Sequence, residues 1–300
     1  MVKKRKNKIN ENPLWATIII YAILVILSVV TIYPILNMFA KSFSEAHVIA
    51  GHPLMLVPMS FTTAAYEYIF STSALTNSFL LTVGITLVGT VLNLILVMTA
   101  SYGLSKPKMP GYSFFRYFII IPMLINAGLI PTYMLIRSIG LLNNPMVLVV
   151  VGLVSPYNLL LVRNYIMSAI PDSLEEAAFI EGANEFQILA RIIVPLSKPI
   201  LATIGLFVAV GYWNDMFTAL FYINDNKFWP LQLMLRSIII SQDMASMGSY
   251  MTTNNSGKVV VTPDNIKAAA IIFTIVPIIM VYPFVQKHFV KGIMLGAVKG

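Results

Sequence analysis

The chain has 300 residues, of which 58% are hydrophobic and only 11% are charged, with a formal net charge of +8. A soluble domain normally carries about 25% charged residues, so this chain has too little polar surface to coat a water-soluble globule and is expected to lie in lipid. The absence of cysteine excludes disulfides, thiol catalysis and cysteine-type metal sites. The three histidines are scattered along the chain, and we expect no metal site.

A basic segment opens the chain and a long apolar run follows it directly. The run is far longer than the apolar region of a signal peptide, which spans about 7–15 residues, and no cleavage site of the small-x-small type follows it. We therefore expect residues 1–13 to form a cytoplasmic tail and residues 14–38 to form an uncleaved first transmembrane helix.

Six apolar stretches are long enough to cross a bilayer, which takes about 20 residues. They lie at roughly 14–38, 77–104, 114–136, 145–163, 200–223 and 266–285. The predicted fold is all-α and polytopic. It has an extracellular loop at 39–76, a five-helix core at 77–285 and a cytoplasmic tail at 286–300.

The distribution of positive charge supports this orientation. Fourteen of the 20 Lys and Arg residues fall on the predicted cytoplasmic side, as the positive-inside rule expects. Both termini are then cytoplasmic. The excess cytoplasmic charge indicates a contact with anionic membrane lipid, so we expect no nucleic-acid partner.

The cytoplasmic loop at 165–198 carries the strongest local signals. Ser173 and Glu176 have the spacing of a capping box, which predicts a helix that begins near Leu174. Gly182 is placed to end that helix, as glycine often does at a helix C-terminus.

A second helix is expected after this turn. Asn184 and Gln187 repeat the capping spacing, and Pro195 is expected to stop the helix. The loop therefore encodes a helix, a tight turn and another helix. Ala177 and Ala178 keep its surface small, so it can dock into a groove on another protein.

This loop resembles the EAA loop of permease subunits of ATP-binding-cassette importers. The pattern of that family is E-A-A, three residues, G, nine residues, then I-x-L-P. Six fixed positions match at the same spacing, namely Glu176, Ala177, Ala178, Gly182, Ile192 and Pro195, with Ile193 at the unspecified position. Val194 departs from the pattern, because the family prefers leucine there, and Glu181 stands where sugar permeases often have aspartate.

The resemblance extends over roughly residues 60–295. Residues 131–144, 159–178 and 205–223 resemble the branch of maltose-type permeases that handles complex or uronate-containing oligosaccharides. It implies a type I importer permease fold and the import of a sugar or oligosaccharide into the cytoplasm across a bacterial plasma membrane. It also implies a second, unlike permease subunit, a dimer of cytoplasmic ATPases and an extracellular solute-binding protein.

The resemblance also places the energy source in another subunit. The chain has no G-x-x-x-x-G-K-[ST] run, so we expect it to be no enzyme and to bind no cofactor, whereas the partner ATPase binds ATP and Mg²⁺. Closure of the ATPase on the loop would then rotate the spans as rigid bodies. The residues expected to couple to the ATPase are Glu175, Glu176, Ala177, Ala178, Glu181, Gly182 and Pro195.

Polar and aromatic side chains within the spans are candidates for the substrate pathway, because sugars present hydroxyl edges and apolar faces. An ionisable residue within a span usually faces a cavity or a partner. Alternatively, polar residues hold helices together, and the partner permease holds most sugar contacts. The candidates are Asn126, Tyr133, Tyr157, Asn158, Tyr212, Trp213, Asn214 and Asp215.

Other functions remain as alternatives. A permease of the same family can carry a solute other than a sugar. A secondary transporter driven by an ion gradient is expected to show paired buried carboxylates, whereas Asp215 alone falls within a predicted span, and no internal repeat is visible. A membrane-embedded enzyme requires a catalytic constellation at the membrane face, which the sequence does not show.

Overall fold

The computed structural model describes residues 13–71, 73–125, 127–247, 252–253 and 259–297. The chain divides into two compact units, each with its own packing. The first comprises Met1–Ile69 with Ser241–Phe273, and the second comprises Phe70–Ile240 with Thr274–Gly300.

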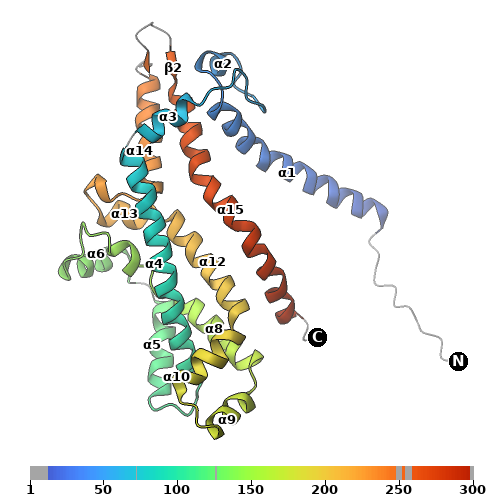
Figure 1. The fold of residues 1–300 in the computed structure, drawn as a ribbon, viewed down its shortest axis with the longest axis vertical. Helices are drawn as coiled ribbons and strands as arrows, with labels where there is room; N and C mark the ends of the chain where they lie inside the picture. The colour runs from blue at the N-terminus through green and yellow to red at the C-terminus, as the bar shows by residue number, and fades with distance from the viewer. Residues whose placement is uncertain (1–12, 72, 126, 248–251, 254–258, 298–300) are drawn as a thin grey trace, which may run out of the picture. The chain divides into compact units, whose positions relative to one another are not determined.

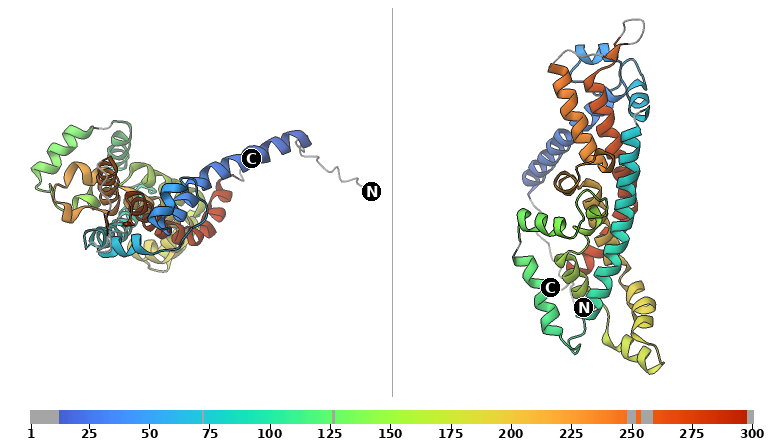
Figure 2. Two further views of the ribbon diagram at one scale, coloured as in Figure 1. Left: turned by 90° about the horizontal axis from the view of Figure 1, so that it is seen from above. Right: turned by 90° about the vertical axis from the view of Figure 1, so that its left-hand side faces the viewer.

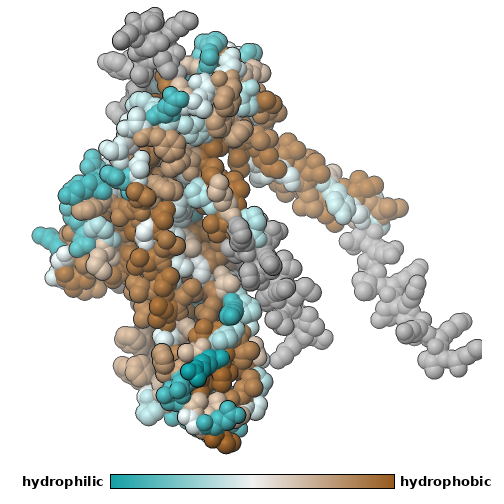
Figure 3. Space-filling model, viewed as in Figure 1, coloured by the Kyte–Doolittle hydropathy of each residue, from teal (hydrophilic) through white to brown (hydrophobic). Residues whose placement is uncertain are grey.

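The first unit contains α1 (Leu14–Ser42), a 29-residue helix whose apolar side chains are exposed along nearly its whole length. Its surface is almost continuously apolar (Figure 3). A helix that is apolar all round and not buried in protein is typical of a membrane span. The helix continues four residues past the predicted end at residue 38.

The predicted extracellular loop is partly helical and is tied to α1 by buried amides. It contains α2 (Ala46–Gly51) and α3 (Ala64–Ser71). The side-chain amide of Asn37 on α1 donates hydrogen bonds to the carbonyls of Pro53 at 3.2 Å and Met55 at 2.9 Å. These bonds fold the loop back along the end of α1.

The first unit also contains a two-stranded antiparallel ribbon and the beginning of the last helix. The ribbon pairs β1 (Thr252–Thr253) with β2 (Val259–Val261), and α15 (Pro263–Ala297) follows. Asn265 near the start of α15 is buried and donates to the carbonyls of Lys41 and Ser44, at 3.0 and 2.8 Å. The start of α15 is thereby fixed to the end of α1.

The second unit is organised around α4 (Ser73–Leu104), which packs against α8 (Pro156–Ala169) and α12 (Lys198–Asn214) (Figures 1 and 2). Gly89 on α4 faces the Tyr212 ring of α12, and a Cβ at position 89 would lie 2.6 Å from that ring. The absence of a side chain at Gly89 therefore allows the two helices to approach closely.

Three of the six predicted spans are not single helices, which corrects the sequence interpretation. The third forms α5 (Tyr112–Leu124) and α6 (Leu129–Ser138), separated near Gly128, whose φ is +83°. The fourth forms α7 (Val147–Val150) and α8, which begins at Pro156 behind the cap Ser155. Glycine at positive φ and proline at a first helical position both interrupt an apolar run without changing its hydropathy.

The fifth predicted span is interrupted in the same way. It forms α12 and α13 (Phe217–Tyr222), separated at Asp215, whose backbone is extended. The 3-10 turn η2 (Asn226–Phe228) and α14 (Leu231–Met247) follow. The sixth predicted span lies within α15, which runs through most of the predicted tail at 286–300 to Ala297.

Three helices of the described residues are long and apolar enough to cross a membrane, namely α1, α4 and the Pro263–Val281 part of α15. A fourth is counted if the bent pair Glu185–Leu196 and Lys198–Asn214 forms one span. The count of six spans therefore stays a prediction, whereas the helical membrane architecture is clear.

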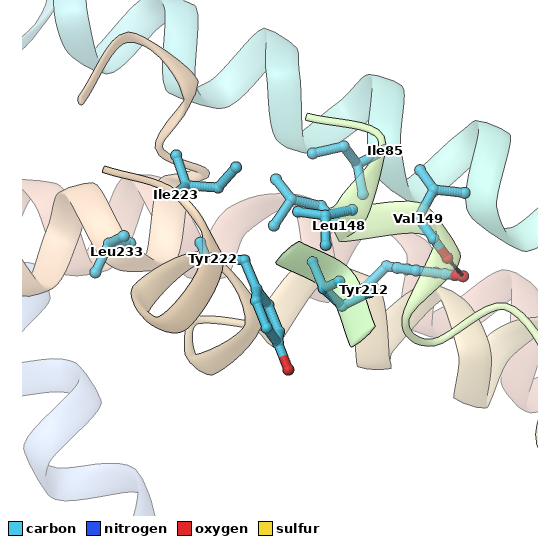
Figure 4. Close-up of a cluster of buried hydrophobic side chains, with 10 residues drawn as sticks. Ile85, Leu148, Val149, Tyr212, Tyr222, Ile223 and Leu233 are labelled. Atoms are coloured by element: carbon cyan, nitrogen blue, oxygen red, sulfur yellow. Dashed lines mark hydrogen bonds between the residues drawn. The ribbon is translucent and has the colours of Figure 1, made fainter. Parts of the chain in front are cut away.

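The interrupted helices meet in one apolar cluster of the second unit (Figure 4). It is formed by buried side chains of α4, α6, α7, α12, α13 and α14 and by Ile223, which follows α13. Its labelled members are Ile85, Leu148, Val149, Tyr212, Tyr222, Ile223 and Leu233.

Candidate coupling hairpin and substrate pathway

The first helix of the hairpin that is predicted to be cytoplasmic is α9 (Asp172–Ile180). It begins two residues before the predicted start, with Pro171 at the N-cap position and no side-chain cap, so the predicted capping box of Ser173 and Glu176 is wrong. Pro171 has the φ of −67° that its ring imposes, and its carbonyl accepts from the Leu174 amide at 3.1 Å. Ser173 is therefore already inside the first turn.

The predicted turn at Gly182 is confirmed. Its φ is +85°, a conformation that side chains other than glycine rarely adopt. The amide of Ala183 donates to the Ala178 carbonyl at 2.9 Å and the amide of Gly182 donates to the Phe179 carbonyl at 3.0 Å. This pair of bonds is a Schellman motif, which satisfies the last carbonyls of α9.

The second capping box is also confirmed. The Asn184 side chain accepts from the Gln187 amide at 2.9 Å, and the Gln187 side chain accepts from the Asn184 amide at 3.0 Å. These bonds start α10 (Glu185–Ile188). The two caps on either side of Gly182 give the hairpin a defined shape.

Pro195 does not stop the second helix where the sequence predicts. The helix widens into the π-turn η1 (Leu189–Ile193) and continues as α11 (Val194–Leu196), with Pro195 in its first turn. The axis then bends by 79° into α12. A proline is tolerated here because it lies directly after a turn whose hydrogen-bonding pattern is already altered.

The seven predicted coupling residues do not share one face of the hairpin. Glu176, Ala177, Glu181, Gly182 and Pro195 are exposed. Glu175 and Ala178 are buried. Only the exposed residues are available to another subunit, so the structure divides the predicted set into a surface part and an internal part.

Sequence reasoning missed the apolar tip of the hairpin. Ile180 is 87% exposed and Phe186 is 76% exposed, and Phe179 is about half exposed. The lower end of Figure 3, in the region of α9, shows apolar and strongly hydrophilic colour side by side. The signal was available for Ile180 and Phe186, because each lies two residues from a buried position, Ala178 or Ile188, and therefore points to the opposite side of its helix. An exposed apolar patch rimmed by charge marks a protein-contact surface.

The inner side of the hairpin packs on the C-terminal end of α4 and on α8. Ala178 and Ile188 lie in a cluster with Val97 and Tyr102 of α4 and Ile166 of α8. This cluster anchors the hairpin by apolar burial.

Charged and polar contacts lie beside that cluster. Glu175 forms an ion pair with Lys106, and the Tyr102 hydroxyl donates to Glu185 Oε2 at 2.5 Å. Burial lowers the pKa of the Lys106 ammonium, while the negative charges of Glu185 and Asp172 oppose this shift.

Two of the proposed pathway residues lie in the protein interior. The Tyr212 hydroxyl donates to the Val149 carbonyl at 2.9 Å, as the dashed line in Figure 4 shows. Trp213 Nε1 donates to the Thr274 carbonyl at 3.3 Å, and its ring meets Phe79 edge-on. Both side chains thus hold helices of the second unit together, which is the alternative role considered for them.

The neighbouring Asn214 and Asp215 lie at the interruption between α12 and α13. Asn214 is exposed, and its Oδ1 accepts from Gln232 at 3.3 Å. Asp215 Oδ1 accepts from the Thr218 amide at 3.1 Å, and the residue lines a small hollow together with Thr82. Polar groups at a broken helix are suited to contact a polar solute.

The other pathway candidates are dispersed. Tyr133 on α6 is half-buried and stacks on Tyr222 with ring centroids 6.0 Å apart. Tyr157 on α8 is exposed and Asn158 is half-buried. Asn126 lies outside the described residues. Within the described residues, no group of three His, Cys, Asp or Glu side chains is arranged to hold a metal ion.

The fold and the hairpin define a class: a helical membrane permease with a structured helical hairpin between its membrane helices. The sequence pattern of the family described as binding-protein-dependent transport system inner membrane component matches residues 15–295. The chain belongs to this family. The resemblance drawn from the hairpin residues is therefore confirmed.

Individual relatives agree with this assignment. The chain is 37% identical to the polygalacturonan/rhamnogalacturonan transport system permease protein YtcP of Bacillus subtilis, over 94% of this chain and 97% of the relative. It is 40% identical to protein LplC of the same organism, over 90% of each chain. It is also similar to a chain in the crystal structure of a bacterial ABC transporter involved in the import of the acidic polysaccharide alginate. The TM-score is 0.84 and the identity is 31%, covering 93% of this chain and 98% of the other.

The chain is accordingly a multi-pass membrane permease subunit of an ABC importer. Subunits of this family do not hydrolyse ATP, and the ATPase and the solute-binding protein are separate partners in the complex.

Proposed function

We propose that this chain imports a sugar or oligosaccharide across a bacterial plasma membrane, as one of two unlike permease subunits, with both termini in the cytoplasm. The permease names of the relatives and the alginate importer support a saccharide substrate. The positive charge on the cytoplasmic side supports the orientation. A cytoplasmic ATPase dimer binds ATP and Mg²⁺ and supplies the energy.

The observation that carries the coupling role is the exposed tip of the hairpin. Glu176, Ala177 and Gly182 are exposed beside the apolar side chains of Ile180 and Phe186. The capped turn holds these residues in one shape before any partner binds, which reduces the entropy lost on docking. This tip inserts into the ATPase subunit.

The test of this role is Gly182→Asp in the assembled transporter. A side chain at φ +85° strains the turn, and the added charge lies in the docking surface. We expect the ATPase to be lost on affinity purification through a tag on this chain, together with ATP-dependent uptake. Gly140→Asp is the matched control, because Gly140 also has a positive φ, +72°, with nothing within 4 Å of an added Cβ, and lies outside the hairpin. Normal ATPase binding and uptake in Gly182→Asp contradict the proposal.

Asn214 and Asp215 are the first candidates for contact with the sugar, because they lie at the helix interruption. Tyr133, Tyr157 and Asn158 are further candidates for sugar contacts, whereas Tyr212 and Trp213 support the pathway wall from within. Asn214→Ala is expected to lower uptake of galacturonate and rhamnogalacturonate oligosaccharides with the complex still assembled. Asn226→Ala, an exposed change outside the interruption, is the control. Normal uptake in Asn214→Ala removes this residue from the pathway.

A further inference from the structure

We propose that Tyr102, Lys106, Glu175 and Glu185 form a clamp that carries the movement of the hairpin into α4, and that Glu175 serves this clamp and not the ATPase surface. The inference rests on the proposed coupling role of the hairpin. It assigns the residues through which that role reaches the membrane helices.

The geometry joins both helices of the hairpin to the same end of α4. Glu175 of α9 is only 5% exposed and pairs with Lys106 in the turn that follows α4. Glu185 of α10 accepts from the Tyr102 hydroxyl at 2.5 Å. The Lys106 ammonium also lies over the Tyr102 ring, 5.0 Å from its centroid. Two attachments to one helix end prevent the hairpin from rotating about either one.

The receiving end of α4 is itself held in place. The Arg163 guanidinium of α8 donates through Nε to the Leu104 carbonyl at 2.7 Å. It also donates to the Tyr112 hydroxyl at the start of α5, again at 2.7 Å. Arg163 thereby satisfies a carbonyl at the C-terminus of α4 and links three helices. A movement of the hairpin that acts on Lys106 is therefore passed to the linked ends of α4, α5 and α8.

The covalent route from the hairpin to α12 is less rigid. It passes through the π-turn η1, Pro195 and a bend of 79°. At the bend, the hydroxyl of Ser197 is buried and has no hydrogen-bond partner among the described residues. A helix interrupted in this way bends more readily than a continuous one. The clamp to α4 is therefore the stiffer path for movement.

Variants of the clamp leave the hairpin folded. Ala178, Ile188 and Ile193 stay packed in the apolar cluster, and the caps at Gly182 and Asn184 do not involve the clamp residues. Lys106→Met and Glu175→Gln remove the ion pair together, which avoids leaving one buried charge unpaired. Lys106→Arg is the conservative control, because it keeps the charge.

The test measures whether the hairpin and α4 move together. The chain has no cysteine, so spin labels can be attached at Leu96→Cys on α4 and Ser173→Cys on the hairpin, both exposed positions outside the docking tip, in a complex with cysteine-free partners. The distance between the labels is measured in the nucleotide-free complex and in the complex trapped with ATP and vanadate.

The expected distance in the parent is the same in both states. The triple variant combines Lys106→Met, Glu175→Gln and Tyr102→Phe. In this variant we expect the ATPase to stay bound and the distance between the labels to change when ATP and vanadate are added. Lys106→Arg is expected to behave like the parent. A distance that stays constant in the triple variant overturns the clamp. Loss of the ATPase from the Lys106→Met/Glu175→Gln complex also overturns it, because Glu175 is then a docking residue, while the coupling role of the hairpin stands. That role fails separately if Gly182→Asp retains ATPase binding and uptake.

Discussion

Replacing Gly89 by alanine tests the close contact between α4 and α12. An alanine Cβ at this position lies 2.6 Å from both Cε2 and Cζ of the Tyr212 ring. The ring is buried, and its hydroxyl is held by the Val149 carbonyl at 2.9 Å. The substitution therefore forces the two helices apart or displaces Tyr212 from its hydrogen bond.

The expected cost follows from three contributions. Overpacking a buried contact costs about 1–3 kcal/mol, and loss of the Tyr212 hydrogen bond costs about 1 kcal/mol more. The higher helix propensity of alanine offsets about 1 kcal/mol of this. We expect a net destabilisation of about 1–3 kcal/mol, with the Tm lowered by about 2–4 °C for each kcal/mol.

The assay is thermal unfolding of the purified permease in detergent, followed by circular dichroism at one heating rate. Gly84→Ala is the matched control, since Gly84 lies on the same helix with nothing within 4 Å of an added Cβ. Its Tm is expected to stay the same or to rise. Gly89→Ala combined with Tyr212→Leu removes the ring, so the pair should lose less stability than the sum of the two single changes. An unchanged Tm in Gly89→Ala, or strict additivity in the pair, refutes the reasoning.

Two further predictions concern buried hydrogen bonds. Trp213→Phe removes the hydrogen bond to the Thr274 carbonyl and keeps an aromatic ring. We therefore expect the unfolding free energy to fall by about 1 kcal/mol and uptake to change little. A large loss of uptake with an unchanged Tm places Trp213 in the substrate pathway instead. Asn37→Ala removes both bonds to the loop carbonyls of Pro53 and Met55, so we expect faster proteolysis near these residues, and an unchanged cleavage rate contradicts this role.

The local shape of the hairpin was largely predictable. The turn at Gly182 and the cap at Asn184 depend on the conformation of a few neighbouring residues, so the residue types at that spacing predict them. The prediction of a Ser173 cap was wrong because the sequence is compatible with two helix starts. Pro171 favours the earlier start, at Asp172. Pro195 was misjudged because the preceding π-turn accommodates it.

The interruptions of the spans were harder to predict. Hydropathy counts apolar residues and is insensitive to the backbone, so the breaks near Gly128, Pro156 and Asp215 were hidden inside apolar runs. The fold class, by contrast, depends on composition and on the length of the runs, which the sequence contains directly.

The sequence by itself determined that this chain is a helical membrane protein, which end of it is basic, and where its capped hairpin lies, because these properties depend on composition and short-range spacing. Only the tertiary structure decided which side of each helix is buried. It turned Glu175 toward Lys106 and left its neighbour Glu176 exposed, and it turned Tyr212 and Trp213 inward beside an exposed Asn214. Adjacent residues on a helix point about 100° apart, and the packing of α4 against distant helices selects which of them it covers.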